Sequence, residues 1–236
     1  MNSKLEIISI FIFNICLIYC IISVFEWYIH KNLMHNGSKN IFINMYDYCF
    51  NYIYNESHRE SHIDHHTKTN NNGSVSNNIA LFFDTFHKFL LPIGILPIII
   101  LVNKLLFGID LTRNMILLLL LLLFAIAWLY EILWNTIHPK YHRWEDNYNE
   151  KGIIENNFIY KYLEKYHMIH HYNKGDNKCN YNIVLPGMDH IMGTYKGCVD
   201  NKEFCKKHKF DSPKNIEICK NEEMNIKLPY GIEYCN

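Results

Sequence analysis

The chain has 236 residues, and its 23 basic and 23 acidic side chains give a formal net charge of zero. The length suits one domain of moderate size, and the balanced charge gives no support for nucleic acid as a partner. The eight cysteines show neither a zinc-finger pattern nor a compact disulfide framework. We expect reduced structural thiols, with a disulfide among Cys198, Cys205, Cys219 and Cys235 as the less favoured alternative.

Three apolar runs predict three membrane spans, the first at about residues 5–25. Within it, Ile7–Phe25 has no charged side chain and as a helix covers about 28 Å, close to the thickness of the bilayer hydrocarbon. A cleaved signal peptide is the alternative, but the run is longer than a typical signal sequence core and no small-x-small cleavage site follows it.

The second and third runs lie at about residues 89–106 and 114–136. The second contains Pro92 and Pro97, so we expect a kinked or broken helix there. The connection between the two runs is short and includes Gly108, which predicts a helical hairpin.

A further segment, Phe42–Tyr54, could lie on the membrane surface or insert partly, so the number of crossings is three or four. The layout predicts an all-α integral membrane bundle with a histidine-rich helical cap. We expect one domain over residues 1–200, with the cap formed by 26–88 and 138–200, and a polar tail at 201–236.

A single crossing followed by a hairpin places both cap segments on one face of the membrane. Basic residues in segment 26–88 favour the cytosol as that face. They are Lys31, Lys39, Arg59, Lys68 and Lys88.

Ten of the fourteen histidines form four tight clusters in the cap, with spacings HX4H, HX2HH, HX3H and HX2HH. They are His30 and His35; His62, His65 and His66; His138 and His142; and His167, His170 and His171. Ten imidazoles are too many for one metal ion and suit two, and an all-nitrogen site suits iron, zinc, copper or nickel. Two irons with about five nitrogens each would leave a position for dioxygen.

The spacings also predict local geometry. Each HX2HH trio falls within one helical turn, so two or three of its imidazoles can face one point. Pro139 restricts His138 to extended backbone and can open a helix in which His142 occupies the first turn. His30 and His35 lie about 140° apart around a regular helix, so they would not converge on one metal unless the helix ends or distorts between them. We expect them to contact different ions or to lie at a frayed helix end.

Three other residues are candidates for supporting a metal ligand by hydrogen bonding. His58 precedes His62 by four positions, and Asp189 and His190 lie together in the stretch MDHIMGTY. The simpler interpretation of each is an ordinary hydrogen-bonded core or surface residue.

Taken together, the clusters resemble the motifs of the fatty acid hydroxylase/sterol desaturase superfamily of membrane di-iron, histidine-box oxidases. The matching stretches are HKNLMH (30–35), HIDHH (62–66), NTIHPKYH (135–142) and YHMIHHYNKG (166–175), with NYNIVLPGMDHIMGTYK (180–196) similar to the block after the last cluster. The resemblance covers about residues 25–197. It implies an all-α membrane fold with a cytosolic two-metal site and a ligand role for all ten clustered histidines.

The resemblance implies two iron ions, although zinc can occupy such sites in purified protein, and dioxygen as co-substrate. It implies hydroxylation of a membrane lipid of fatty acyl or sphingolipid type, in the endoplasmic reticulum; a sterol C-5-type desaturase is the alternative within the family. The chain has no Rossmann fingerprint and no HPGG haem motif, so cytochrome b5 or a ferredoxin is the expected electron donor.

A different class of function is a non-catalytic membrane metal-binding or transport protein. Transport predicts ionisable residues inside the spans. Ile7–Phe25 and Asn114–Tyr130 contain none, which favours the oxidase.

Overall fold

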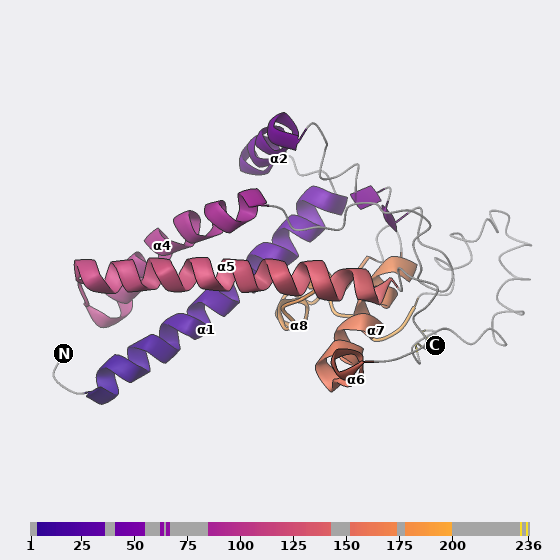
Figure 1. Ribbon diagram of the computed structural model, residues 1–236. Helices are drawn as coiled ribbons and strands as arrows, with labels where there is room; N and C mark the ends of the chain where they lie inside the picture. Colours follow the sequence, from indigo (N-terminus) through magenta and orange to yellow (C-terminus); the bar gives the residue numbers. More distant parts are fainter. Residues whose placement is uncertain are drawn as a thin grey trace, which may run out of the picture. The chain divides into compact units, whose positions relative to one another are not determined.

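The computed structural model describes residues 4–35, 41–54, 62–63, 65–66, 85–142, 152–173 and 178–199, together with Ile232 and Cys235. These residues form helices and irregular loops, and no strand occurs among them (Figure 1). Three helices are long and apolar enough to cross a membrane. The predicted all-α membrane bundle is confirmed.

The chain divides into two compact units. The first consists of Met1–Phe25 and Phe82–Thr136, and the second of Glu26–Leu81 and Ile137–Asn236. All ten clustered histidines belong to the second unit, so the candidate site lies within one compact body.

The candidate membrane spans are Ile8–His35, Lys88–Phe107 and Arg113–Tyr141. They correspond to α1 (Lys4–Tyr28) with the π-helix η1 (Ile29–His35), to α4 (Thr85–Phe107) and to α5 (Arg113–Tyr141). Long runs of Leu and Ile form these helices, and many of those side chains are exposed on the surface of the structure. Such helices satisfy their backbone internally, which the bilayer core requires.

Helix α4 runs without a break through Pro92 and Pro97, so of the two expected forms the broken helix is wrong and the kinked helix stays a prediction. Each proline removes one backbone donor, but the buried stripe Leu91, Ile95 and Ile99 recurs every four residues across both of them. Packing along this stripe keeps the segment helical.

The predicted hairpin joins α4 to α5 within the first unit. Gly108, with φ of +64°, ends α4 in the left-handed conformation that glycine adopts without strain, and its N–H bonds to the Lys104 carbonyl at 3.0 Å. The Lys88 ammonium lies 2.8 Å from the Glu131 carboxylate, which ties the start of α4 to the later part of α5. The two helices are therefore antiparallel neighbours.

An amide pair joins α1 to α4 in the same unit. Asn103 Nδ2 donates to Asn14 Oδ1 at 2.7 Å, and both side chains are buried. Next to this pair, the rings of Phe13 and Phe107 meet edge to face with centroids 5.0 Å apart. Hydrogen bonds between polar side chains are a common link between helices in lipid.

The second unit contains α2 (Ile41–Tyr54), α6 (Ile153–Asn156), α7 (Phe158–Tyr172) and α8 (Met188–Ile191). Helix α2 has 14 residues, or about 21 Å, which is too short to cross the hydrocarbon and favours three crossings over four. Its exposed side chains include one helical stripe of Ile41, Met45, Tyr48 and Tyr52.

Cys198 and Cys235 form a disulfide with Cα atoms 5.1 Å apart, so the expectation that all thiols are reduced was wrong for this pair. The Cys235 N–H also bonds to the Val199 carbonyl at 3.0 Å. The pairing joins residues 37 positions apart, a separation that carries no local signal in the sequence. Cys205 and Cys219 lie outside the described residues.

Candidate metal centre

Nine of the ten clustered histidines gather into two groups that could each hold a metal ion. We call them the five-histidine group, of His30, His35, His62, His66 and His170, and the four-histidine group, of His65, His142, His167 and His171. Within each group, the candidate ligand nitrogens all lie within 4.8 Å of one another.

The tenth histidine, His138, lies beside the four-histidine group. Its ring centroid is 4.7 Å from that of His167 and 5.6 Å from that of His65, and its side chain is buried. The structure therefore brings all ten predicted residues into one part of the second unit, with His138 at the edge of its group.

Each HX2HH trio places its first and third histidines in one group and its second histidine in the other, and the two trios do so with the groups exchanged. His62 and His66 belong to the five-histidine group, whereas His65, between them, belongs to the other. His167 and His171 belong to the four-histidine group, and His170 to the five-histidine group. Successive residues of a helix point about 100° apart, so each His-His pair sends one imidazole to each group. The expectation that two or three imidazoles of each trio face one point is met by two of them, the residues four apart.

His30 and His35 converge on the same group, which overturns the expectation that they contact different ions. Their Nε2 atoms lie 3.2 Å apart. The reason is the π-helix over Ile29–His35, because its i to i+5 hydrogen bonding brings residues five apart onto one face. A regular α-helix would separate them.

His138 is helical, and the prediction of extended backbone before Pro139 was wrong. Helix α5 continues through Pro139 and ends at Tyr141, and the His142 N–H bonds to the Pro139 carbonyl at 3.1 Å. The side chain of Tyr141, fully buried beside the His167 ring at a centroid distance of 5.3 Å, packs this last turn against the site. Tertiary packing thus outweighs the local restriction that proline imposes.

Backbone carbonyls fix the proton position on two histidines of the five-histidine group. His30 Nδ1 donates to the Tyr181 carbonyl and His170 Nδ1 donates to the Cys179 carbonyl, both at 2.6 Å. A neutral imidazole carries one proton, so Nε2 of each ring presents a lone pair to the other imidazoles. Metal-binding histidines are commonly held in this way, with the N–H that does not face the metal donating to a backbone carbonyl.

The crowding of the nitrogens in this group suits a cation. The Nε2 atoms of His30, His35 and His62 form a triangle with sides of 3.2, 3.1 and 3.1 Å. His30 Nε2 carries no proton, so at most two N–H groups serve three contacts, and they cannot all be hydrogen bonds. A metal ion bound to the three nitrogens would replace contacts that hydrogen bonds alone cannot satisfy.

The nitrogens of the four-histidine group are crowded in the same way. Nε2 of His167 lies 2.9 Å from Nε2 of His142 and 3.1 Å from Nε2 of His171. His65 faces this pair of contacts, with its ring centroid 4.4 Å from His142 and 4.7 Å from His171. Within the described part of the chain, both groups contain histidine alone.

Burial keeps these imidazoles neutral. The pKa is lowered well below 6.5 for six residues outside the candidate spans, first by burial and then by neighbouring imidazoles. They are His62, His65, His66, His167, His170 and His171. At neutral pH they need lose no proton to bind a metal ion.

Among the described contacts, His35 has surroundings that suit a metal least. The Lys178 ammonium lies against its Nδ1. An ammonium only donates, so a neutral His35 then carries its proton on Nε2, the atom that faces the group. Metal binding at this residue requires that proton or the lysine contact to give way.

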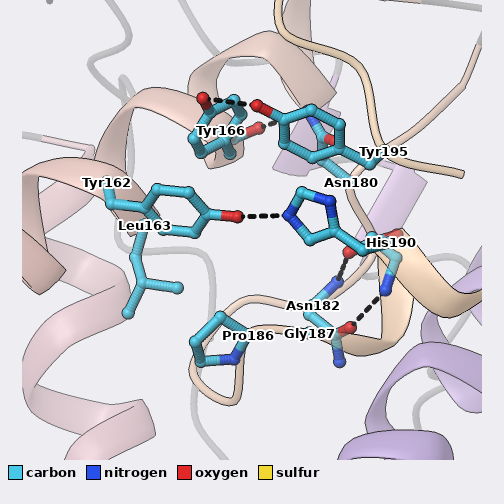
Figure 2. Close-up of a pocket in the computed structure, with 10 residues that line it drawn as sticks. Tyr162, Leu163, Tyr166, Asn180, Asn182, Pro186, Gly187, His190 and Tyr195 are labelled. Atoms are coloured by element: carbon cyan, nitrogen blue, oxygen red, sulfur yellow. Dashed lines mark hydrogen bonds between the residues drawn. The ribbon is translucent and has the colours of Figure 1, made fainter.

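Of the predicted supporting residues that the structure describes, only Asp189 is hydrogen-bonded to the loop beside the five-histidine group. The carboxylate of Asp189 accepts from the N–H groups of Tyr181 and Asn182 at 2.8 and 2.7 Å, so it contacts the loop that holds His30. His190 is exposed, and its Nε2 lies 2.8 Å from the Tyr162 hydroxyl in a surface pocket (Figure 2). His58 lies outside the described residues.

Two supporting groups were missed because backbone atoms carry their role. Cys179 and Tyr181 act through carbonyls, which any residue type provides, so no side-chain pattern could identify them. The only signal was their position next to the last histidine cluster. Glu26, whose carboxylate accepts from backbone N–H groups of the same loop, follows the first apolar run and was not among the predicted site residues.

Scans of protein-family models, of curated proteins and of solved structures find no match to this chain. The interpretation of the site therefore rests on its geometry and on the spacing of the histidines.

Proposed function

We propose that this chain is a membrane di-iron oxygenase that hydroxylates a lipid of fatty acyl or sphingolipid type. The observation that carries the proposal is the gathering of nine histidines into two all-nitrogen groups, in a chain with three candidate membrane spans. An all-imidazole donor set suits iron among the first-row metals, and zinc is its main competitor. The histidine motifs support the same assignment through their resemblance to the fatty acid hydroxylase/sterol desaturase superfamily.

One ion would be held by the five-histidine group and the other by the four-histidine group with His138 beside it. When bound, the two irons would supply the activation of dioxygen that an unreactive C–H bond requires. The chain supplies neutral imidazoles, held by burial, and fixes the tautomers of His30 and His170.

Buried aromatic side chains give the centre a dry surrounding. The ring of Tyr181 lies 5.6 Å from those of both His30 and His170, and Tyr141 and Tyr172 are fully buried in the same unit. Excluding water protects an oxidising centre from side reactions.

The lipid substrate and the electron source follow from the same proposal. A chain with three apolar spans gives access to membrane lipids, whose hydrocarbon tails offer little except C–H bonds to attack. Two electrons per turnover would come from an external carrier such as cytochrome b5 or a ferredoxin. A membrane of the endoplasmic reticulum is the proposed location. The basic residues of segment 26–88 favour a cytosolic centre, whereas the Cys198–Cys235 disulfide favours an oxidising face.

The test is metal analysis of the purified full-length protein with one variant for each group. We expect about two metal ions per chain in the wild type and about one in each of His170→Ala and His65→Ala. The double variant should hold almost none. Tyr195→Phe, on the surface pocket, serves as the matched control. Two ions retained in both single variants would refute the proposal.

Lipid analysis of cells that express the wild type or the double variant tests the reaction. A gain of hydroxylated lipids only with the wild type is the expected result. A new double bond instead would identify a desaturase that uses the same ligands. Bound metal with unchanged lipids would indicate the non-catalytic metal-binding alternative.

A further inference from the structure

We propose that Glu26 and Asp189 are positioning residues that set the tautomers of His30 and His170 before any metal binds. They do so by fixing the loop of residues 179–185, whose carbonyls accept from the two imidazoles. This inference rests on the proposed two-metal site, and it adds that the five-histidine group is pre-organised by two carboxylates that bind no metal.

Asp189 holds the first part of the loop. Its Oδ1 accepts from the Tyr181 N–H at 2.8 Å and from the Thr194 hydroxyl at 2.7 Å, and its Oδ2 accepts from the Asn182 N–H at 2.7 Å. The Asp189 N–H returns a bond to Asn182 Oδ1 at 3.1 Å. Both carboxylate oxygens are therefore engaged in a buried, reciprocal contact.

Glu26 holds the second part. Its Oε1 accepts from the N–H groups of Ile183 and Val184, the latter at 2.8 Å, and its Oε2 accepts from the Leu185 N–H at 3.2 Å. Its side chain is 4% exposed. The two carboxylates thus bind the N–H groups of five consecutive residues, 181 to 185.

Asn180 fixes the residue between the two carbonyls that face the histidines. It adopts the left-handed conformation with φ of 54°, which asparagine tolerates better than most residues. Its side chain exchanges two hydrogen bonds of 2.9 Å with the backbone of Lys196. Cys179 and Tyr181 are consequently held on either side of a fixed turn.

The burial of two carboxylates, Glu26 and Asp189, indicates that they do more than fill space. Burying a carboxylate is unfavourable unless hydrogen bonds compensate its desolvation, and apolar residues would fill the same space without that penalty. Carboxylates can, however, orient a run of backbone N–H groups, which apolar side chains cannot. The Asn182 N–H, which Asp189 binds, belongs to the same peptide as the Tyr181 carbonyl that faces His30. The Cys179 carbonyl that faces His170 shares its peptide with the Asn180 N–H, which donates to the Thr194 carbonyl at 3.0 Å, and Asp189 holds Thr194 through its hydroxyl.

The experiment compares Asp189→Asn and Glu26→Gln with Tyr195→Phe in the full-length protein. Tyr195 lies on the same segment, but its hydroxyl bonds to the Tyr166 hydroxyl at the surface pocket (Figure 2). Anaerobic titration with Fe²⁺ should show affinity at the five-histidine group reduced roughly 10- to 100-fold in both carboxylate variants. Affinity at the four-histidine group, and both affinities in the control, should stay at the wild-type value.

A second readout needs no metal. Nitrogen NMR of metal-free protein labelled at histidine should show Nδ1-protonated rings for His30 and His170 in the wild type and in Tyr195→Phe. In the carboxylate variants these two signals should shift toward the Nε2-protonated form. Wild-type tautomers together with wild-type affinities at both groups would overturn the inference.

Thr194→Val covers the case in which a carboxylate variant fails to fold, because it removes one hydrogen bond to Asp189 and leaves the charge. It should weaken Fe²⁺ binding at the five-histidine group alone, and equal weakening at both groups would count against positioning. A wild type that binds fewer than two ions would refute the proposed function, while the tautomer measurement would still decide this inference.

Discussion

His66 and His171 stack on each other, with ring centroids 4.1 Å apart and planes inclined by 25°, although they belong to different histidine groups. His66 comes from the second histidine cluster and His171 from the end of α7. The two candidate metal sites are therefore in contact through this stacked pair of imidazoles. Replacing either histidine removes a packing partner from a ligand of the other site.

His171→Ala should weaken both sites, and His142→Ala only one. His171 is a member of the four-histidine group and also supports the His66 ring, so its loss should lower Fe²⁺ affinity at the five-histidine group by about tenfold as well. His142 packs against His65, His167 and His171 of its own group. Titration of both variants measures the difference, and identical effects would show that the stacked pair does not couple the sites.

His35→Ala should cost less metal than His170→Ala. His170 has its proton fixed on Nδ1 by the Cys179 carbonyl, whereas Lys178 opposes the ligand form of His35. Metal analysis should find the five-histidine group nearly empty in His170→Ala and mostly filled in His35→Ala. A greater loss in His35→Ala would mean that the lysine contact gives way when metal binds.

The metal-free protein should lose stability as the pH falls below 6.5, the ordinary pKa of histidine. Burial lowers the pKa of six site histidines in the folded state, so below 6.5 the unfolded chain binds more protons than the folded one. Each residue then contributes a loss of up to about 1.4 kcal/mol per pH unit, down to its lowered pKa. Above 6.5 both states are neutral and this contribution to stability is complete and constant.

Melting of chelator-treated protein between pH 7.5 and pH 5 measures this effect. A variant with two of the buried histidines replaced, His65→Ala with His167→Ala, should show a shallower fall. A melting temperature that is flat over this range would contradict the neutral, buried state of the cluster.

The three candidate spans and the grouping of histidines four residues apart were predictable from the sequence because both depend on local patterns. Apolar length identifies a membrane helix, and histidines four apart share a helical face. The pairs His62 with His66 and His167 with His171 lie in one group each, as that spacing requires.

The remaining features depend on tertiary structure. Nothing local distinguishes the π-helix at Ile29–His35 from a regular helical turn, and this element alone decides that His30 and His35 share a group. Helix α5 passes Pro139 because the buried turn at Tyr141 compensates a local preference. The carbonyls of Cys179 and Tyr181 carry no side-chain signal at all.

The Cys198–Cys235 disulfide should protect both thiols from alkylation until a reductant is added. Disulfides persist in oxidising compartments, so a protected pair in intact cells would place the second unit on an oxidising face and oppose the predicted cytosolic orientation. Mass mapping after alkylation measures the protection, with Cys179 as the internal control. Burial raises the pKa of the Cys179 thiol to about 11, so it should stay unreactive both before and after reduction. Labelling of Cys198 and Cys235 without reductant would support the cytosolic orientation instead.

The Asn14–Asn103 pair should contribute to the packing of α1 on α4 only while both amides are present. Asn103→Leu removes the 2.7 Å bond to Asn14 Oδ1 and leaves a buried amide with fewer partners, so the first unit should lose roughly 1 kcal/mol. Asn14→Leu should cost a similar amount, while the double variant should recover most of the loss because two apolar side chains then meet in an apolar surrounding. Unfolding in lipid bicelles measures the cycle, with Thr136→Val on α5 as a control for loss of one exposed hydroxyl. Strictly additive losses would show that the two amides do not act as a pair, and that α1 and α4 associate through their apolar side chains alone.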